Sequence, residues 1–245
     1  MTTDSNSEVG RAVFASTHWS VVVQAGQEDS PGTSEALAHL CRTYWYPLYA
    51  YVRRKGYAAP DAEDLTQEFF AKLLARHFLS AADRRKGKFR SFLLGAFEHF
   101  LAGEWRRAHA EKRGGGQASF SLEEMNAEQR YRLEPAPELP PERLFDRRWA
   151  TTVLEAAREE LKKEYQTRDQ AELFGKLQGV LSSDDSASYA EIGRDLQMSE
   201  GAVKVAAHRL RKRYGELIRA QIAETVATPA QVDEELRYLF AVLRE

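Results

Sequence analysis

The amino-acid sequence predicts an all-α protein in which two helical domains are joined by an acidic, proline-containing linker. Apolar residues recur at intervals of three and four in most segments between turn signals, a pattern typical of amphipathic helices. Four of the eight prolines stand together in one acidic stretch, which favours a linker there. The predicted parts are an N-terminal segment with one short helix (1–33), a first helical domain (34–116), the linker (117–143), a second domain with a helix-turn-helix (144–222) and a C-terminal amphipathic helix (223–245).

The composition is that of a soluble globular protein, with 43% hydrophobic and 29% charged residues in a chain of 245. We find no apolar run long enough to cross a bilayer and no export signal, so we expect no membrane insertion and a cytoplasmic location. Cys41 is the single cysteine; it cannot form an internal disulfide and is expected to be a small core residue. The net charge of −2 conceals segregated charge, because residues 83–116 hold nine basic and four acidic side chains.

The first helices are predicted from caps and breakers. Thr17 caps a short helix over 18–25. Ser34 opens a longer helix, which must kink or restart at Pro47 because proline removes an internal hydrogen bond. Gly56 is a natural residue to follow the end of this helix.

An acidic helix is predicted over residues 60–74. Pro60 suits its first turn, and the carboxylates that follow stand where the helix dipole favours anions. The expected inward stripe is Leu65, Phe69 and Leu73, and the expected outer face carries Asp64, Gln67, Glu68 and Lys72. Spacing alone leaves two interpretations open: the acids only stabilise the helix N-terminus, or the outer face is a binding surface.

A basic loop over 84–88 leads into a helix over 89–107 in which aromatic and basic residues alternate. Such a mixture suits single-stranded nucleic acid, since bases stack on rings while cations hold the backbone. The spacing of Phe92 and Phe100 also describes an ordinary buried helix face. We therefore expect most of these rings in the core and keep Phe89, at the edge of the loop, as a stacking candidate.

The linker, 117–143, is expected to be largely extended. From 117 to 146 the chain holds three basic and seven acidic residues. Helix resumes near Leu144 and is followed by a second helical stretch over 171–181 and a polar loop over 182–187.

Residues 188–214 are predicted to form two helices joined by a tight turn. Ser199 stands where an N-cap belongs, and Val203, Ala207 and Leu210 form a stripe that can pack back onto the first helix. The residues left facing outward on the second helix are Glu200, Lys204, Val205, His208, Arg209, Arg211 and Lys212. From 200 to 219 six basic residues stand against two acidic ones, which is typical of a helix that enters the major groove of DNA. The plainer alternative is a solvated basic face.

The last helix is predicted after a capping box. Thr228 and Gln231 have the required spacing, with Pro229 at the first helical position. The helix that follows is amphipathic and must bury its apolar face on this chain or on a partner.

This arrangement resembles the bacterial RNA polymerase sigma-70 family, and within it the extracytoplasmic-function (ECF) group, from about residue 45 to 217. Residues 61–70, with the sequence DAEDLTQEFF, are similar to family region 2.2. The resemblance implies that Asp64, Gln67 and Glu68 contact the β′ coiled coil of bacterial core RNA polymerase. The long linker and the C-terminal extension exceed what a minimal two-domain member needs, which suggests a variant with a built-in regulatory or packing element.

Residues 88–107 resemble regions 2.3 and 2.4, with which the family melts the -10 promoter element. The resemblance implies -10 DNA contacts by Lys88, Phe89, Arg90, His99, Arg106 and Arg107. The usual Asn and Asp of region 2.4 appear as His99 and Gly103, a departure that bears on -10 sequence preference.

The helix-turn-helix resembles region 4, which binds the -35 element and the polymerase β flap. The resemblance implies -35 DNA contacts by Lys204, Val205, His208, Arg209 and Arg211. It implies a sigma factor whose partners are core polymerase, promoter DNA and, as a further partner that the family admits, an anti-sigma factor or other regulator.

Two other functions were weighed against this one. A helix-turn-helix regulator that does not engage core polymerase would have no use for an acidic outer face at Asp64, Gln67 and Glu68. An enzyme is not expected, because the six histidines show no metal-ligand spacing and no nucleophile motif stands out. We accordingly expect no catalytic residues, no metal and no cofactor.

Overall fold

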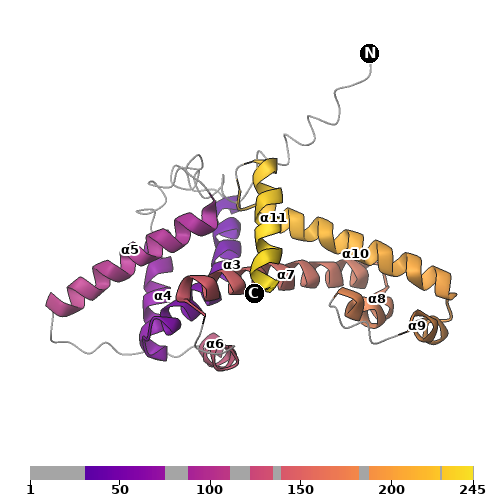
Figure 1. Cartoon of the computed structure of the whole chain (residues 1–245), viewed down its shortest axis with the longest axis horizontal. Helices are drawn as coiled ribbons and strands as arrows, with labels where there is room; N and C mark the ends of the chain where they lie inside the picture. The colour runs from indigo at the N-terminus through magenta and orange to yellow at the C-terminus, as the bar shows by residue number, and fades with distance from the viewer. Residues whose placement is uncertain are drawn as a thin grey trace, which may run out of the picture. The chain divides into compact units, whose positions relative to one another are not determined.

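The computed structural model describes residues 31–74, 88–110, 122–134, 139–181, 188–226 and 228–244, and all regular secondary structure among them is helical. This confirms the all-α prediction. The helices are α3 (Pro31–Arg54), α4 (Ala59–Leu74), α5 (Phe89–Ala110), α6 (Leu122–Arg132), α7 (Pro141–Thr167), α8 (Ala171–Leu177), the 3₁₀ turn η3 (Gln178–Leu181), α9 (Tyr189–Asp195), α10 (Glu200–Ala223) and α11 (Pro229–Arg244) (Figure 1). The short helix expected over 18–25, most of the basic loop and the loop 182–187 lie outside the described residues.

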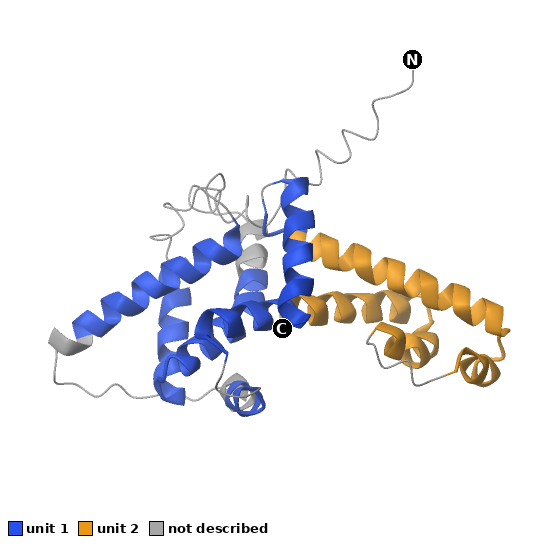
Figure 2. Cartoon of the chain, in the orientation of Figure 1, with its two compact units in different colours: residues 1–151, 223–245 blue, residues 152–222 orange. Residues whose placement is uncertain are grey.

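The chain divides into two compact units (Figure 2). Unit 1 comprises residues 1–151 and 223–245, and unit 2 comprises residues 152–222. These boundaries differ from the expected ones, because the C-terminal helix belongs to unit 1 and α7 is one continuous helix that contributes to both units. The first turns of α7 belong to unit 1 because Phe145 and Trp149 are buried there, before the boundary at residue 151.

The core of unit 1 is formed by aromatic and aliphatic side chains of α3, α4 and α5. Phe69 of α4 meets Phe97 of α5 edge to face, with ring centroids 4.7 Å apart, and Tyr44 of α3 meets Phe89 of α5 at 5.4 Å. Helix α3 runs through Pro47 as one continuous helix, so of the two expected outcomes, a kink or a restart, the restart does not occur. The residues on either side of the proline are buried, so packing holds the helix together despite the hydrogen bond that Pro47 cannot donate.

The stretch expected to be an extended linker contains α6, which packs on α3. The Glu128 carboxylate accepts hydrogen bonds from the Tyr49 hydroxyl at 2.8 Å and from Nε of Arg53 at 2.9 Å. The Tyr46 hydroxyl donates to Glu134 at 2.7 Å. The acidic side chains on which the linker prediction rested therefore hydrogen-bond this segment to α3.

Two local predictions are confirmed by backbone and side-chain geometry. Gly56 has φ +95°, the left-handed conformation that follows many helix C-termini. Thr228 and Gln231 form the reciprocal capping box, with hydrogen bonds of 3.2 and 3.4 Å, at the start of α11. Among the helices described, none is both long enough and apolar enough to cross a membrane.

Candidate nucleic-acid interface

The helix-turn-helix in unit 2 is formed by α9 and α10, and side-chain caps define both helix starts. Ser188 precedes α9 in an extended conformation, and its hydroxyl accepts a hydrogen bond from the backbone N–H of Ala190 at 3.3 Å. Ser199 precedes α10 and accepts from the N–H of Ala202 at 3.2 Å, which confirms the predicted N-cap.

The turn between the two helices depends on a close backbone approach at Gly193. The N–H of Met198 donates to the carbonyl of Gly193 at 2.8 Å, and Gln197 has φ +53°. A Cβ atom added to Gly193 would lie 2.7 Å from the carbonyl oxygen of Met198. Glycine is therefore required for the chain to reverse this tightly between α9 and α10.

The predicted inward stripe of α10 is confirmed. Val203, Ala207 and Leu210 are at most 1% exposed, and Ile192 of α9 is 3% exposed. Further along, Arg213 of α10 donates to Glu164 of α7 at 2.6 and 3.0 Å, and the Tyr214 hydroxyl donates to the Leu154 carbonyl at 3.1 Å. These bonds fix α10 on α7 and leave the opposite side of α10 to solvent.

The outward face of α10 carries the residues that the sequence predicted. All of Glu200, Lys204, Val205, His208, Arg209, Arg211 and Lys212 are exposed. Val205 is half exposed, an apolar side chain suited to contact a thymine methyl group between flanking cations. Lys204 is bonded to Glu200, one turn earlier, at 2.6 Å.

Arg211 differs from the other cations of this face. Its Nε donates to the Val180 carbonyl of η3 at 3.1 Å, and its Nη1 donates to the Tyr189 hydroxyl of α9 at 3.3 Å. Arg211 therefore ties α10 to two neighbouring elements while its side chain stays exposed. Its structural role is to hold the helix-turn-helix together.

The acidic face of α4 is also exposed. Asp64, Gln67 and Glu68 all face solvent, whereas Phe69 and Leu73 are buried. Lys72 bridges Glu68 at 2.6 Å and Glu104 of α5 at 2.8 Å. The predicted amphipathic division of α4 is thus confirmed, and the outer face is anchored to α5 through Lys72.

At the start of α5 the structure buries two candidate residues, Phe89 and Arg90, within unit 1 and leaves a third, Lys88, partly exposed beside them. Phe89 is 1% exposed, in contact with Tyr44 rather than at a loop edge. Arg90 is buried and ion-paired with Asp146 of α7 and Glu235 of α11, and Lys88 lies 2.8 Å from Glu235. The expectation that Phe89 is a loop-edge ring available for base stacking therefore differs from the structure. The sequence could not show that α11 returns to this position.

The middle and the other end of α5 keep their candidates exposed. His99, Arg106 and Arg107 all face solvent, and Arg107 donates to Glu104 at 2.7 Å. Given about 1.5 Å per residue, His99 lies roughly 14 Å along the helix from Arg90, and Arg106 lies roughly 24 Å from it. The six expected -10 contacts are therefore divided between a largely buried cluster at the start of α5 and exposed positions further along it.

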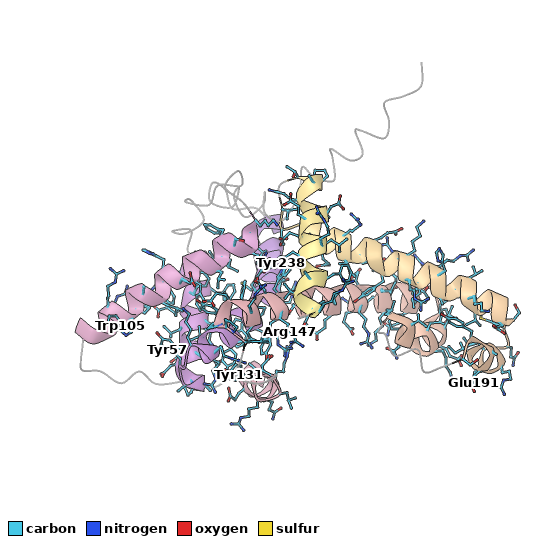
Figure 3. All side chains as sticks on the ribbon, in the orientation of Figure 1. Tyr57, Trp105, Tyr131, Arg147, Glu191 and Tyr238 are labelled. Carbon is cyan, nitrogen blue, oxygen red and sulfur yellow. The ribbon has the colours of Figure 1, made fainter. Side chains whose placement is uncertain are left out.

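Sequence reasoning did not single out Trp105, which is 56% exposed beside Arg106 on α5. Its spacing of four from buried Leu101 extends the apolar stripe and so favours the core. Figures 1 and 3 show that the last turns of α5 extend beyond α4, so α4 does not cover the stripe there. The signal that could have revealed it is its place between Glu104 and a pair of arginines.

The described residues include no group of three or more His, Cys, Asp or Glu side chains placed to hold a metal ion. The exposed groups of α4, α5 and α10 can bind partners through charge and stacking. No protein-family model, no curated protein and no solved structure matches the chain.

Proposed function

We propose that the protein is an RNA polymerase sigma factor of the ECF type, which binds core polymerase and directs promoter recognition, -10 melting and transcription initiation. The observation that carries the proposal is the helix-turn-helix of α9 and α10, whose second helix exposes a basic face. A compact turn, a capped second helix and outward cations are the features with which such motifs enter the major groove.

In this proposal α10 contacts the -35 element. Lys204, His208 and Arg209 supply cations to phosphates and base edges, and Val205 supplies an apolar contact. Arg211 contributes mainly by holding α10 against α9 and η3, because its Nε and Nη1 donate hydrogen bonds there.

The exposed acidic face of α4 supports a contact with the β′ coiled coil of core polymerase. Asp64, Gln67 and Glu68 present carboxylates and an amide to solvent on a helix whose opposite side is buried. A regulator that acts on DNA alone has no need of such a surface. In this proposal His99, Arg106 and Arg107, which are exposed along α5, contribute to the -10 contact.

The experiment is run-off transcription with purified bacterial core polymerase, the full chain and a pool of genomic promoter fragments. The informative variant is Gln67→Ala/Glu68→Ala, with core binding measured alongside. Lys72 keeps its bond to Glu104 in this variant, so the attachment of α4 to α5 is retained. Gln170→Ala/Glu172→Ala removes an exposed Gln/Glu pair in unit 2 and is the matched control.

We expect specific transcripts with the wild type and the control, and loss of both core binding and transcripts with the α4 variant. DNA binding by the wild type without core binding or transcripts would instead establish a helix-turn-helix regulator that does not engage polymerase. Equal transcription by all three proteins would remove the role assigned to the α4 face.

A further inference from the structure

Helix α11 covers the start of α5 within unit 1. Val232, Leu239 and Val242 are buried and form its apolar face. Glu235 lies on this same face, three residues after Val232 and four before Leu239, and is 1% exposed. Burying a carboxylate costs free energy unless cations pair with it. The groups around Glu235 therefore indicate the role of this helix face.

Those surroundings are the first residues of α5. The Arg90 guanidinium points Nε and Nη2 at the two Glu235 oxygens, each at 3.3 Å, and Nη1 at Asp146 of α7. The Nζ of Lys88 lies 2.8 Å from Glu235. We define Lys88, Arg90, Asp146, Glu235 and Tyr238 as the clasp.

Tyr238 completes the clasp from α11. Its ring lies 4.4 Å from the Arg90 guanidinium carbon, and its hydroxyl donates to the second oxygen of Asp146. Burial alone would lower the pKa of Arg90, but Glu235 and Asp146 more than offset it and raise that pKa. Arg90 is therefore cationic at any pH at which the protein folds.

The geometry of the clasp is that of an occupied anion site. Two cations converge on one carboxylate, and the planar guanidinium presents two donors to it, as arginine does to phosphate oxygens. Lys88 and Arg90 are also residues to which the proposed function assigns -10 DNA contacts. In this conformation the position that a phosphate would take beside them is filled by Glu235.

We propose that α11 is an intramolecular competitor of nucleic acid, in which Glu235 occupies the phosphate site of Lys88 and Arg90 until a DNA backbone displaces it. The competitor role rests on the proposed function, because only a sigma factor would bring the start of α5 to the -10 strand. The competitor role also goes further than that function, since it assigns the C-terminal helix a regulatory role and names the competing group.

Exchange of the Glu235 carboxylate for a phosphate keeps the charges in the clasp balanced. Removing α11 into water alone would leave Lys88 and Arg90 with Asp146 as their only carboxylate in the clasp, which is unfavourable for a partly buried pair of cations. When a phosphate enters, the cations keep two anionic partners and Glu235 becomes solvated. The clasp therefore opens more readily to a polyanion than to solvent.

The test uses the full chain and a fluorescein-labelled single-stranded oligonucleotide carrying a promoter -10 sequence, with a duplex of equal length for comparison. Glu235→Gln removes the competing charge and keeps the side-chain shape. The matched control is Glu234→Gln, whose carboxylate is half exposed and lies 3.6 Å from Lys88. Circular dichroism checks that both variants keep the helix content of the wild type.

We expect Glu235→Gln to bind the single strand about tenfold or more tightly and Glu234→Gln to stay within about twofold of the wild type, in line with usual coupling between two sites. Hydrogen exchange of the wild type gives a second, independent measurement. Addition of the oligonucleotide should accelerate backbone exchange over 229–244. This measurement decides the matter if Glu235→Gln fails to fold.

Unchanged affinity in a folded Glu235→Gln variant, or exchange over 229–244 that the oligonucleotide leaves unchanged or slows, would overturn the competitor role and make the clasp a permanent part of the fold. Neither result depends on whether the wild type supports transcription, so the proposed function would stand. Conversely, a wild type that neither binds core polymerase nor gives transcripts removes the sigma-factor proposal, whatever the oligonucleotide shows.

Discussion

Arg213 of α10 donates hydrogen bonds to both carboxylate oxygens of Glu164 of α7, although 49 residues separate them in the chain. The hydrogen bonds from Arg213 hold the pKa of Glu164 below its ordinary value of 4.5, against the opposing effect of burial. Because α10 carries the candidate DNA-binding face, this pair connects the stability of unit 2 to the placement of that face.

The first prediction concerns this pair and pH. A carboxylate whose pKa is lowered on folding contributes stability above its unfolded pKa and loses that contribution as pH falls through the folded value. Glu164→Gln should therefore reduce the free energy of unfolding by about 1 kcal/mol at neutral pH. The deficit should shrink as pH falls below 4.5, the ordinary pKa of the side chain, and disappear once pH falls through the lowered pKa of Glu164.

Urea unfolding followed by circular dichroism, at neutral pH and at acidic pH, measures this deficit. Glu159→Gln is the control, because Glu159 is 61% exposed and its contact with Lys162 is 3.7 Å long. A deficit of equal size at both pH values would show that Glu164 acts through packing rather than charge.

The second prediction concerns the turn of the helix-turn-helix. Gly193→Ala would place Cβ 2.7 Å from the Met198 carbonyl oxygen, a rigid backbone group, so the turn must open. We expect a loss of about 2 kcal/mol in stability, within the usual range for overpacking, and weaker DNA binding. Gly215→Ala, in the interior of α10 with no atom within 4 Å of its added Cβ, should be neutral or stabilising by up to about 1 kcal/mol. Similar effects for the two substitutions would remove the steric argument.

The sequence predicted local features of the fold well and long-range ones poorly. The Ser199 cap, the buried stripe of α10 and the capping box at Thr228 depend on residues within one or two helical turns, and all three are present. The partners of Glu128 and Glu235 could not be predicted in this way. They lie 75 and 145 residues away, and a surface carboxylate and an ion-paired buried one look the same in a sequence.

The candidate site shows the same division. The outward residues of α10 follow from periodicity, and all of them are exposed. Phe89, Arg90 and Trp105 do not follow from it, because their exposure depends on which other elements cover α5. Helix α11 covers one end of α5, and the other end extends past α4 (Figure 1).

The third prediction concerns the one cysteine of the chain. Burial raises the pKa of the Cys41 thiol from 9.0 to about 11, only partly opposed by Arg42. Since the thiolate is the nucleophile, native protein near neutral pH should react with iodoacetamide roughly a hundredfold more slowly than urea-unfolded protein. Intact-protein mass spectrometry over time measures both rates. Equal rates would mean that α3 opens readily around Cys41.

The fourth prediction concerns the attachment of α6 to α3. The Tyr49 hydroxyl donates to Glu128 at 2.8 Å, and Tyr49→Phe removes that bond alone. The variant should lose about 1 kcal/mol of stability and show faster hydrogen exchange over 127–132. Arg132→Ala is the control, because the Arg132 side chain is 75% exposed and its pair with Glu128 spans 3.4 Å. Unchanged exchange in Tyr49→Phe would show that other contacts hold α6.

The last prediction concerns DNA binding by α10. Lys204→Ala and Arg209→Ala should each weaken binding to -35 duplex DNA and lower the slope of log affinity against log salt by about 1, as loss of one phosphate contact requires. Lys163→Ala removes a charge from α7 whose side chain is 70% exposed, against 57% for Lys204, so it should leave both quantities unchanged. Fluorescence anisotropy over a salt titration measures affinity and slope together.

Two neighbouring residues sharpen this test. Glu200 lies 2.6 Å from Lys204, on the same exposed face, and its carboxylate repels phosphate while it occupies the ammonium group. Glu200→Gln should therefore strengthen DNA binding, the opposite direction to Lys204→Ala. Arg211→Ala should weaken binding and also lower thermal stability, because it frees the Val180 carbonyl and the Tyr189 hydroxyl. If all four α10 variants instead bind DNA as the wild type does, with the same salt slope, α10 is not the DNA-binding helix and its basic face is only solvated.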